Sequence, residues 1–493
     1  MIDAVSNATN AYLSRMPKAR RKTHGQFFTG QNTARFMAGL FSPERFGGDL
    51  SILDPGAGTG ILSAAVVECL QKHSSVKRIR LVCYETDPNV RGILESNLRF
   101  LADRSAIPVE WELRTENYIA SQADTYNHSL YAAVNPERFD LVIGNPPYKK
   151  LPKDALEARA MPDVCHGAPN LYFLFAAMAL FNLKADAEMV FIIPRSWTSG
   201  VYFRRFRERF LRDGALERIH LFKSRDKVFG QEEVLQETMI VKIRKSFRKP
   251  DRIVLSSSET SEDFSSLQTL ELPYSVVVSG SDSYVFLPTS HEEAATLRKL
   301  AGFKETLPHI GLRMKTGLTV DFRNGEDLRN SAEAGAVPLF QSRHIRDGHV
   351  VFPVGKPHEY IMARQPALLQ RNANYLFLKR FTSKEERRRL QCGVYLARQH
   401  PGYPLISTQN KVNFIGGSTD LPDKIVFGLY VLFNSTLYDS YYRILNGSTQ
   451  VNSTEINAMP VPSIDAIADM GGELLRCRDM SEGTCDRILE SYL

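Results

Sequence analysis

With 493 residues the chain is long enough for about two or three domains, and its 43% hydrophobic and 24% charged residues are typical of a globular protein. The 62 Lys and Arg against 55 Asp and Glu give a net charge of +7, which alone does not indicate nucleic-acid binding but is compatible with a local basic cleft. Six scattered cysteines without a CxxC pair argue against a structural zinc site and a disulfide framework, and the longest apolar run, residues 171–181, is too short to span a bilayer. We therefore expect a soluble protein of a reducing cytoplasm.

The first candidate site residue is Thr29, at the end of a motif over residues 24–30 that follows a polar, basic leading segment. Apolar residues recur at helical spacing over residues 32–41, so Thr29 is expected close to the start of a helix. A hydroxyl and free backbone N–H groups at such a position can hold a carboxylate. A simple helix-capping segment is the alternative.

Residues 50–60 predict a strand and a glycine turn, followed by a helix from Ile61. Gly56 and Gly58 allow the backbone to approach a ligand closely, as in nucleotide-binding turns. The turn lacks both the Lys-Ser/Thr ending of a P-loop and the GxGxxG spacing of a dinucleotide site. Asp54 at the strand end would repel a phosphate and attract an ammonium group, which indicates an amino-acid-like cofactor.

Two further strand ends carry polar residues that suit a nucleoside. Glu85 follows the strand at residues 80–84, where an acid can accept hydrogen bonds from both ribose hydroxyls; an exposed acid before a helix is the alternative. Asn117 follows the strand at residues 109–113, and its side-chain carbonyl can accept a hydrogen bond from an adenine amino group. Any polar residue after a strand would look similar.

The fourth predicted strand, residues 139–143, leads into the turn Asn145-Pro146-Pro147-Tyr148. The two prolines cannot continue a sheet ladder, so they hold Asn145 and Tyr148 rigidly at the end of the sheet where ligands bind. The alternation of strands and helices predicts a doubly wound parallel sheet. The side-chain amide, main-chain carbonyls and aromatic ring of this turn suit a flat, polar, aromatic substrate.

The next predicted elements complete this sheet. They are a buried helix at 169–181, a strand at 188–194, an arginine-rich helix at 202–211 with Phe203 near its start, and strands near 218–222 and 238–243.

The C-terminal half has a different texture. A Ser-rich linker over residues 246–270 precedes short strand-like segments broken by Gly and Pro. Basic and aromatic residues interleave over 374–389, and a loop over 441–452 is rich in Arg, Asn and Gln, which contact phosphates and base edges. The candidates for nucleic-acid contact are Lys379, Arg380, Arg387, Arg388, Arg389 and Arg443. A solvated charged face is the alternative.

Taken together, these motifs resemble the gamma class of S-adenosylmethionine-dependent N6-adenine DNA methyltransferases, in detail over residues 20–245. The resemblance implies an α/β fold with a doubly wound, Rossmann-like methyltransferase sheet in residues 1–245. It also implies that the linker 246–270 joins this sheet to a C-terminal α+β target-recognition domain in residues 271–493. The segments 315–323 and 378–390 are similar to type II modification methylases of the PstI and BsuBI group.

The resemblance assigns roles to the candidate residues. Contacts to S-adenosylmethionine are implied for Thr29 (methionine carboxylate), Asp54 (methionine amine), Gly56 and Gly58 (cofactor loop), Glu85 (ribose), Asn117 (where the family has Asp), and Phe175 with residues 170–172 (beside the cofactor adenine). Catalysis is implied for the NPPY residues Asn145, Pro146 and Tyr148, with Phe203 as the aromatic residue that sandwiches a flipped base. No metal is implied.

The chemistry of an adenine N6 amine agrees with these roles. Its lone pair is delocalised into the ring, so the amine becomes nucleophilic only when two acceptors hold its hydrogens, and the Asn145 side chain and the Pro146 carbonyl can be those acceptors. A base inside a duplex must flip out at a cost of a few kcal/mol. Stacking on Tyr148 and Phe203 can return about 1 to 3 kcal/mol per face.

The expected function is site-specific methylation of double-stranded DNA by a cytoplasmic prokaryotic enzyme, the modification half of a restriction-modification system. A separate cognate endonuclease would act on the same site without a stable complex, since the first motif lies too near the start of the chain for a fused nuclease ahead of it. Two alternatives remain. One is a protein glutamine N5-methyltransferase, whose amide substrate needs the same two acceptors; the other is a catalytically inactive methylase fold that serves as a DNA-specificity subunit.

Overall fold

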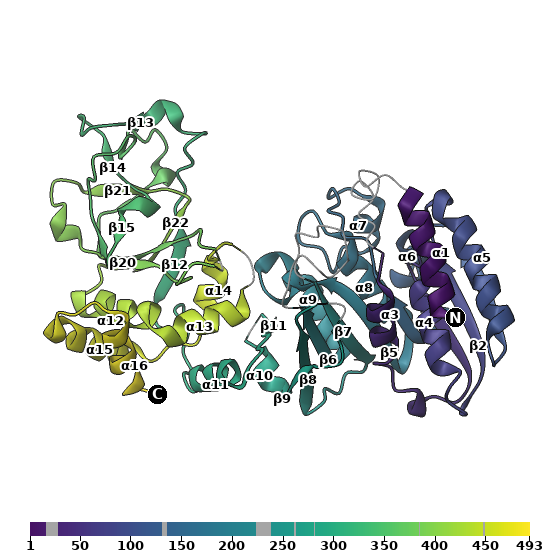
Figure 1. Ribbon diagram of the computed structural model, residues 1–493. Coiled ribbons are helices and arrows are strands. Elements are labelled where there is room, and N and C mark those ends of the chain that lie inside the picture. Colours follow the sequence, from purple (N-terminus) through teal and green to yellow (C-terminus); the bar gives the residue numbers. More distant parts are fainter. Residues whose placement is uncertain are drawn as a thin grey trace. The chain divides into compact units, whose positions relative to one another are not determined.

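The computed structural model describes residues 1–15, 28–130, 136–222, 238–260, 263–280, 282–383, 385–446 and 449–493. Residues 24–27 of the first motif, Lys384 and residues 447–448 of the polar loop, on which sequence predictions were made, lie outside these ranges. The chain divides into two compact units, Met1–Thr289 and Ser290–Leu493 (Figure 1).

In the described part of the first unit, a nine-stranded sheet has the order β3-β2-β1-β4-β5-β7-β6-β8-β9. Its strands are β1 (Gly48–Asp54), β2 (Val76–Tyr84), β3 (Val109–Arg114), β4 (Phe139–Gly144), β5 (Leu183–Pro194), β6 (Gly214–Phe222), β7 (Thr238–Lys245), β8 (Arg252–Ser258) and β9 (Gln268–Pro273). The first five strands pair in parallel, and β7 is antiparallel to both β5 and β6. The predicted doubly wound parallel sheet is confirmed.

Two groups of helices accompany this sheet (Figure 1). One group comprises α1 (Ile2–Arg15), α3 (Gln31–Ala38), α4 (Ile61–Leu70) and α5 (Pro88–Arg104). The other comprises α6 (Tyr118–Tyr126), α7 (Leu156–Ala160), α8 (Leu171–Asn182) and α9 (Arg204–Asp213). After the sheet come the short helix α10 (Tyr274–Val277) and a hairpin of two strands, β10 (Val278–Ser279) and β11 (Tyr284–Val285). Right-handed crossovers explain the two groups, because the chain moves outward from β1 to β3 and then returns past β1 to β4.

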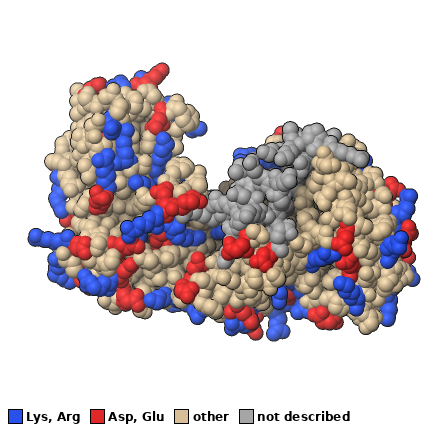
Figure 2. Space-filling model, viewed as in Figure 1, with Lys and Arg blue, Asp and Glu red and all other residues tan. Residues whose placement is uncertain are grey.

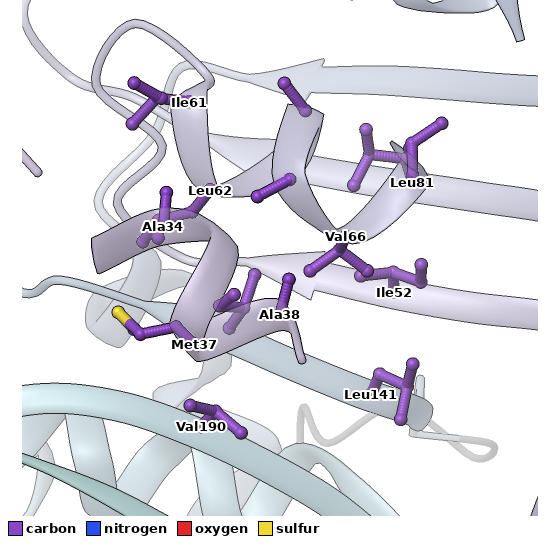
Figure 3. Close-up of a cluster of buried hydrophobic side chains, with 14 of the residues drawn as sticks. Ala34, Met37, Ala38, Ile52, Ile61, Leu62, Val66, Leu81, Leu141 and Val190 are labelled. Carbon is purple, nitrogen blue, oxygen red and sulfur yellow. The ribbon is translucent and has the colours of Figure 1, made fainter. Parts of the chain in front are cut away.

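The core below one helix group contains side chains from both helices and strands. Figure 3 shows Met37 of α3 and Val66 of α4 beside Ile52, Leu141 and Val190, which come from β1, β4 and β5. All five side chains are fully buried. Helices cover both faces of this sheet, so its strands need nearly continuous runs of apolar residues.

The point where the winding direction reverses determines where a ligand site can form. β1 lies between β2 and β4, so the segment after β1 turns towards one group of helices and the segment after β4 turns towards the other. The two segments diverge and leave a crevice outside the carboxyl ends of the strands. The glycine turn and the Asn145 turn are these two segments.

The boundary between the units lies later in the chain than the sequence indicates. Residues 246–270, expected as a linker, contain β8 and the start of β9, and β8 pairs in parallel with β6 of the nine-stranded sheet. A Ser-rich composition is typical of linkers, but Ser256, Ser257 and Ser258 lie in β8, the second strand from the edge of the sheet. There Ser256 and Ser258 form hydrogen bonds with His220.

The second unit combines two sheets with a set of helices. In its described residues a six-stranded sheet has the order β12-β22-β19-β20-β16-β15 and a five-stranded sheet the order β13-β17-β14-β21-β18. The strands are β12 (Leu312–Thr316), β13 (Leu328–Arg329), β14 (Val337–Phe340), β15 (Ile345–Arg346), β16 (His349–Val350), β17 (Tyr360–Ile361), β18 (Leu369–Arg371), β19 (Tyr375–Lys379), β20 (Cys392–Tyr395), β21 (Leu405–Thr408) and β22 (Val412–Gly417). The predicted C-terminal α+β unit is confirmed as a fold.

The helices of the second unit are α11 (His291–Leu300), α12 (Asp423–Asn434), α13 (Thr436–Leu445), α14 (Ser453–Ala458), α15 (Ile464–Cys477) and α16 (Glu482–Glu490). α12 and α15 cross so closely at Gly428 and Gly471 that neither position has room for a Cβ atom. In the described residues of both units, no helix combines the length and the apolar character needed to cross a bilayer.

Candidate cofactor and substrate site

A cavity of about 490 Å³ lies at the carboxyl ends of the first four strands, at the reversal point of the sheet. Its volume is in the range of ordinary cofactor pockets. The structure brings seven of the predicted site residues into its wall: Thr29, Gly56, Gly58, Glu85, Asn117, Asn145 and Phe175. Among the described residues the wall does not include Asp54, Pro146, Tyr148 or Phe203.

The glycine turn forms one side of this cavity. Gly58 has a φ of +54°, and a Cβ atom there would lie 3.5 Å from the ring of Phe28, which also lines the cavity. A side chain at Gly58 would therefore meet both an unfavourable backbone conformation and an aromatic neighbour. Thr59 in the same turn bonds to Thr9 of α1 at 2.7 Å, so the N-terminal helix, which the sequence did not predict, helps to hold the turn.

Glu85 links the glycine turn to the second strand end. Its Oε2 accepts from the Gly58 N–H at 3.0 Å, and its Oε1 accepts from the Asp87 N–H at 2.8 Å. The carboxyl group is 8% exposed, and burial raises its pKa above the usual range although both backbone N–H groups act in the opposite direction. The remaining lone pairs of this carboxylate can accept hydrogen bonds from the two hydroxyls of a ribose in the cavity.

Asp54 lies behind the cavity wall and not in it. The side chain is fully buried, and its Oδ2 accepts a hydrogen bond from the Ser63 hydroxyl at 2.8 Å. Burial raises the pKa of Asp54 to about 7, with a smaller contribution from the charge of Glu85, against the lowering effect of the bond from Ser63. The sequence predicts direct contact of Asp54 with a cofactor amine. The described wall of the cavity includes the next two residues, Pro55 and Gly56, but not Asp54.

The raised pKa of Asp54 predicts how stability depends on pH. The folded chain holds this proton more tightly than the unfolded chain, so the contribution to stability is complete below pH 3.8 and is lost as pH rises to about 7. The total is about 4 kcal/mol. We expect the free energy of unfolding of Asp54→Asn, measured relative to the wild type by urea unfolding, to rise between about pH 5 and about pH 7.

A matched variant separates this effect from a general pH response. Burial raises the pKa of Asp213, but the bonds and charges of Arg212 and Arg209 outweigh burial and leave that pKa below its usual value. Asp213 therefore stays ionised over the same pH range, and Asp213→Asn should differ from the wild type by a constant amount. A constant difference for Asp54→Asn as well would refute a titrating Asp54.

Asn117 lines the cavity, but both ends of its amide are engaged within the protein. The side-chain oxygen caps α6 by accepting from Ile119 N–H at 3.1 Å and Ala120 N–H at 3.0 Å, and the nitrogen donates to Glu157 at 2.7 Å. The predicted bond from an adenine amino group to this oxygen would compete with the helix cap. Glu157 also lines the cavity, and no sequence motif pointed to it.

Asn145 and Thr29 meet at the cavity although 116 positions separate them in the chain. The Asn145 amide nitrogen donates to the Thr29 hydroxyl at 3.1 Å. This bond orients the amide, with its carbonyl end directed away from Thr29. Pro146 is buried and Pro147 lines the cavity, so the turn contributes backbone as well as the amide.

Tyr148 and Phe203 belong to an aromatic cluster next to this turn. Each lies beside the ring of Tyr172 in α8, with centroids 6.2 Å apart for Tyr148 and 6.3 Å apart for Phe203. The Tyr148 hydroxyl donates to the Ile192 carbonyl at 3.1 Å, which fixes the ring against β5. The two predicted stacking residues are therefore brought to one cluster by the helix after the NPPY turn.

Arg207 is a residue that the sequence noted only as one charge among several. Its side chain is fully buried, and its Nη1 donates to the carbonyls of Trp197, Ser199 and Gly200, each at 3.1 Å. These carbonyls belong to the turn between β5 and Phe203. Arg207 thus holds the segment that carries Phe203, and only the fold distinguishes it from the exposed arginines of the same helix.

The predicted nucleic-acid contacts in the second unit are engaged in protein contacts. The partners are Gln391 for Lys379, Asn410 for Arg380, Glu482 for Arg387 and Arg388, Asn446 for Arg389, and Asp439 for Arg443. Arg389 is fully buried against the ring of Tyr442. The prediction that Arg389 contacts phosphates is therefore wrong, because this strand-flanking run docks onto α13 and α16 and is not a free basic surface.

Comparisons with known proteins identify the family of the chain. The Eco57I restriction-modification methylase family matches residues 67–229. The type II methyltransferase M.BsuBI of Bacillus subtilis is 32% identical over 96% of this chain and 94% of its own length, and M.PstI of Providencia stuartii is 31% identical over 96% and 93%. The solved structure of the type IIL restriction-modification enzyme MmeI in complex with DNA has a TM-score of 0.51, at 12% identity, over 94% of this chain and 71% of that one, which is a likeness of fold.

These matches define a restriction-modification methylase. The agreement with two relatives extends over nearly the whole length of all three chains. The chain belongs to the family of the type II methyltransferases M.BsuBI and M.PstI, and the resemblance inferred from its sequence is confirmed.

Proposed function

We propose that the chain is a site-specific DNA adenine-N6 methyltransferase that uses S-adenosylmethionine and acts as the modification enzyme of a restriction-modification system. The family supports methyl transfer to DNA. The cofactor would supply the methyl group. The residues of the cavity fit it: Glu85 offers acceptors for a ribose diol, Gly58 keeps the wall open, and Phe28 and Phe175 offer apolar surfaces for a purine.

One observation carries the assignment of the methylated group. Asn145 follows the central strand β4 and lies in the same cavity wall as Glu85, with its amide oriented by Thr29. The amide carbonyl and the Pro146 carbonyl are the two acceptors that an amine conjugated to an aromatic ring needs to become nucleophilic. No cysteine nucleophile or histidine base lines the described part of this cavity.

Base flipping follows from the depth of this turn. Asn145 is half-buried in the wall of the cavity, and we infer that a base within a duplex must leave its stack to reach it. Tyr148 and Phe203, both partly buried and both beside Tyr172, offer the aromatic surfaces that a flipped adenine requires. Base stacking on aromatic rings contributes about 1 to 3 kcal/mol per base.

The choice of DNA over a protein amide rests on the second unit. A glutamine N5-methyltransferase would use the same acceptors, but the relatives that share the whole length of this chain, second unit included, are type II methyltransferases. An inactive specificity subunit is disfavoured because Glu85, Thr29 and Asn145 are all present and assembled. A separate cognate endonuclease is part of the proposal.

Base-resolved methylation sequencing of cells that express the protein tests the proposal. We expect N6-methyladenine at one short sequence in almost all its occurrences, and in only a small fraction of them in cells that express Asn145→Ala. Methylation of cytosine would refute the adenine assignment. Tritiated methyl groups on a glutamine-containing protein, with none on DNA, would refute the DNA substrate.

A further inference from the structure

The second unit contains a groove of about 560 Å³ whose charge is entirely positive. It lies between the β12–β22 strand pair and the short strand β18. Its cations are Arg313, Lys315 and Arg371, and no Asp or Glu occurs among its described lining residues. The remaining wall mixes apolar side chains such as Leu368 and Phe414 with polar ones, among which Gln370, Thr408 and Ser418 can form hydrogen bonds.

The alternation of β12 explains why two of the cations face the same way. Leu312 and Met314 are buried and anchor the strand, so Arg313 and Lys315 between and after them point to the exposed face. Arg371 ends β18 on the other side of the groove and is also exposed. Both walls of the groove therefore carry positive charge.

These three cations have no internal partner. Within the described residues, none of the side chains of Arg313, Lys315 and Arg371 forms a hydrogen bond or an ion pair with the protein. The predicted DNA contacts Arg387 and Arg388 differ, because each is within 3.0 Å of Glu482. An exposed cation without a carboxylate partner is available to a phosphate at no cost in broken ion pairs.

Close packing fixes the shape of the groove floor. The ring of Tyr375 lies directly under Gly416, where a Cβ atom would come within 2.8 Å of it, and backbone carbonyls of Thr408 and Gln409 leave no room for a Cβ atom at Gly317. The Tyr375 hydroxyl donates to the Arg371 carbonyl at 2.8 Å, which ties the floor to the β18 wall. The groove is a built feature of the two sheets.

One exposed apolar side chain lines the groove, and a second follows it along the chain. Leu318 lines it and is 61% exposed, and Phe322, four residues further along, is 84% exposed with the guanidinium of Arg323 over its ring at 5.5 Å. A small inorganic anion would leave these side chains in water. A nucleic acid uses both kinds of surface, since phosphates take the cations and bases take apolar and aromatic contacts.

We propose that this groove is the surface through which the second unit binds duplex DNA, with Arg313, Lys315 and Arg371 on the phosphates and Leu318 and Phe322 towards the bases. This inference rests on the proposed function. It moves the DNA contacts from the 379–389 run, whose cations are engaged by side chains and carbonyls of the protein, to a groove whose cations are not.

The test compares two triple variants with the same change in net charge. In the first, Arg313, Lys315 and Arg371 become Ala. In the control, Lys299, Arg387 and Arg398 become Ala; all three are exposed and paired with carboxylates. Fluorescence anisotropy with a short duplex that carries the methylated sequence, over a series of salt concentrations, gives affinity and its salt dependence.

We expect the slope of log affinity against log salt concentration to fall by about 0.9 per lost phosphate contact, and hence by about 2.7 for the groove variant. The control should keep the wild-type slope. Phe322→Ala should weaken binding without a change of slope. Circular dichroism and calorimetric binding of S-adenosylmethionine verify that the variants are folded.

A groove variant that binds S-adenosylmethionine and keeps the wild-type slope would overturn the inference, as would a control variant that loses the same slope. Tight binding of single-stranded RNA or of a free nucleotide by the wild type, with weaker binding of the duplex, would overturn it too. Failure of the proposed function is distinguishable, because the wild-type protein would then transfer no methyl group to DNA at any salt concentration.

Discussion

Replacing Asn145 with Ala is expected to lower the rate of methyl transfer about 100- to 1,000-fold, the range found when one preorganised hydrogen-bonding group is removed from an active site. The variant loses one of the two acceptors for the amine hydrogens. Binding of S-adenosylmethionine should change only a few-fold, because Glu85 and the glycine turn are untouched. Incorporation of tritiated methyl groups into DNA at saturating cofactor measures the rate, and calorimetry measures the binding.

Asn89→Ala is the matched control for this variant. Asn89 lines the same cavity, but its side chain bonds to Asp87 at the start of α5, after a different strand from the one that leads to the NPPY turn. We expect its rate at saturating cofactor to stay within about twofold of the wild type. An unchanged rate in Asn145→Ala, or an equal loss in both variants, would remove Asn145 from its proposed role.

Replacing Glu85 with Ala is expected to weaken S-adenosylmethionine binding about 100-fold or more. Hydrogen bonds to a charged group are worth about 1.5 to 3 kcal/mol each, and this substitution removes the ribose acceptor together with the partners of the Gly58 and Asp87 N–H groups. Calorimetric titration measures the dissociation constant. The rate at saturating cofactor should fall far less, since Glu85 does not contact the amine that is methylated.

Glu85→Gln separates a binding role from a structural one. Its carbonyl oxygen can keep one of the two backbone bonds, so the glycine turn should stay folded while the charge is lost. We expect intermediate affinity and an unfolding temperature near that of the wild type. Wild-type affinity in both variants would show that the ribose does not bind here.

The strand-end residues were predictable because the carboxyl ends of parallel strands meet at one edge of a sheet. Gly58, Glu85 and Asn145 each follow a strand whose apolar pattern is clear in the sequence, and the structure brings all three to one cavity. Asn117 illustrates the limit of this reasoning. It is in the cavity wall as expected, but whether a side-chain amide is free or caps a helix depends on the geometry of the next turn.

Charged residues were the least predictable feature. A basic run such as residues 379–389 has the same composition whether its side chains face water or acidic partners. The partner of Arg388 is Glu482 of α16, which lies 94 positions further along the chain. Arg443 pairs with Asp439 one helical turn away in α13, but it also donates to carbonyls of the distant 379–389 run.

The sequence by itself determined the α/β class, the order of the methylase motifs and the residues at the strand ends, because each depends on local apolar periodicity and on turns of a few residues. Only the tertiary structure decided that Asp54 lies behind the cavity, that Thr29 orients Asn145, and that Arg313, Lys315 and Arg371 line one groove without a carboxylate among its described residues. Burial and ion pairing depend on which distant segments pack together, and no local pattern in the chain records that.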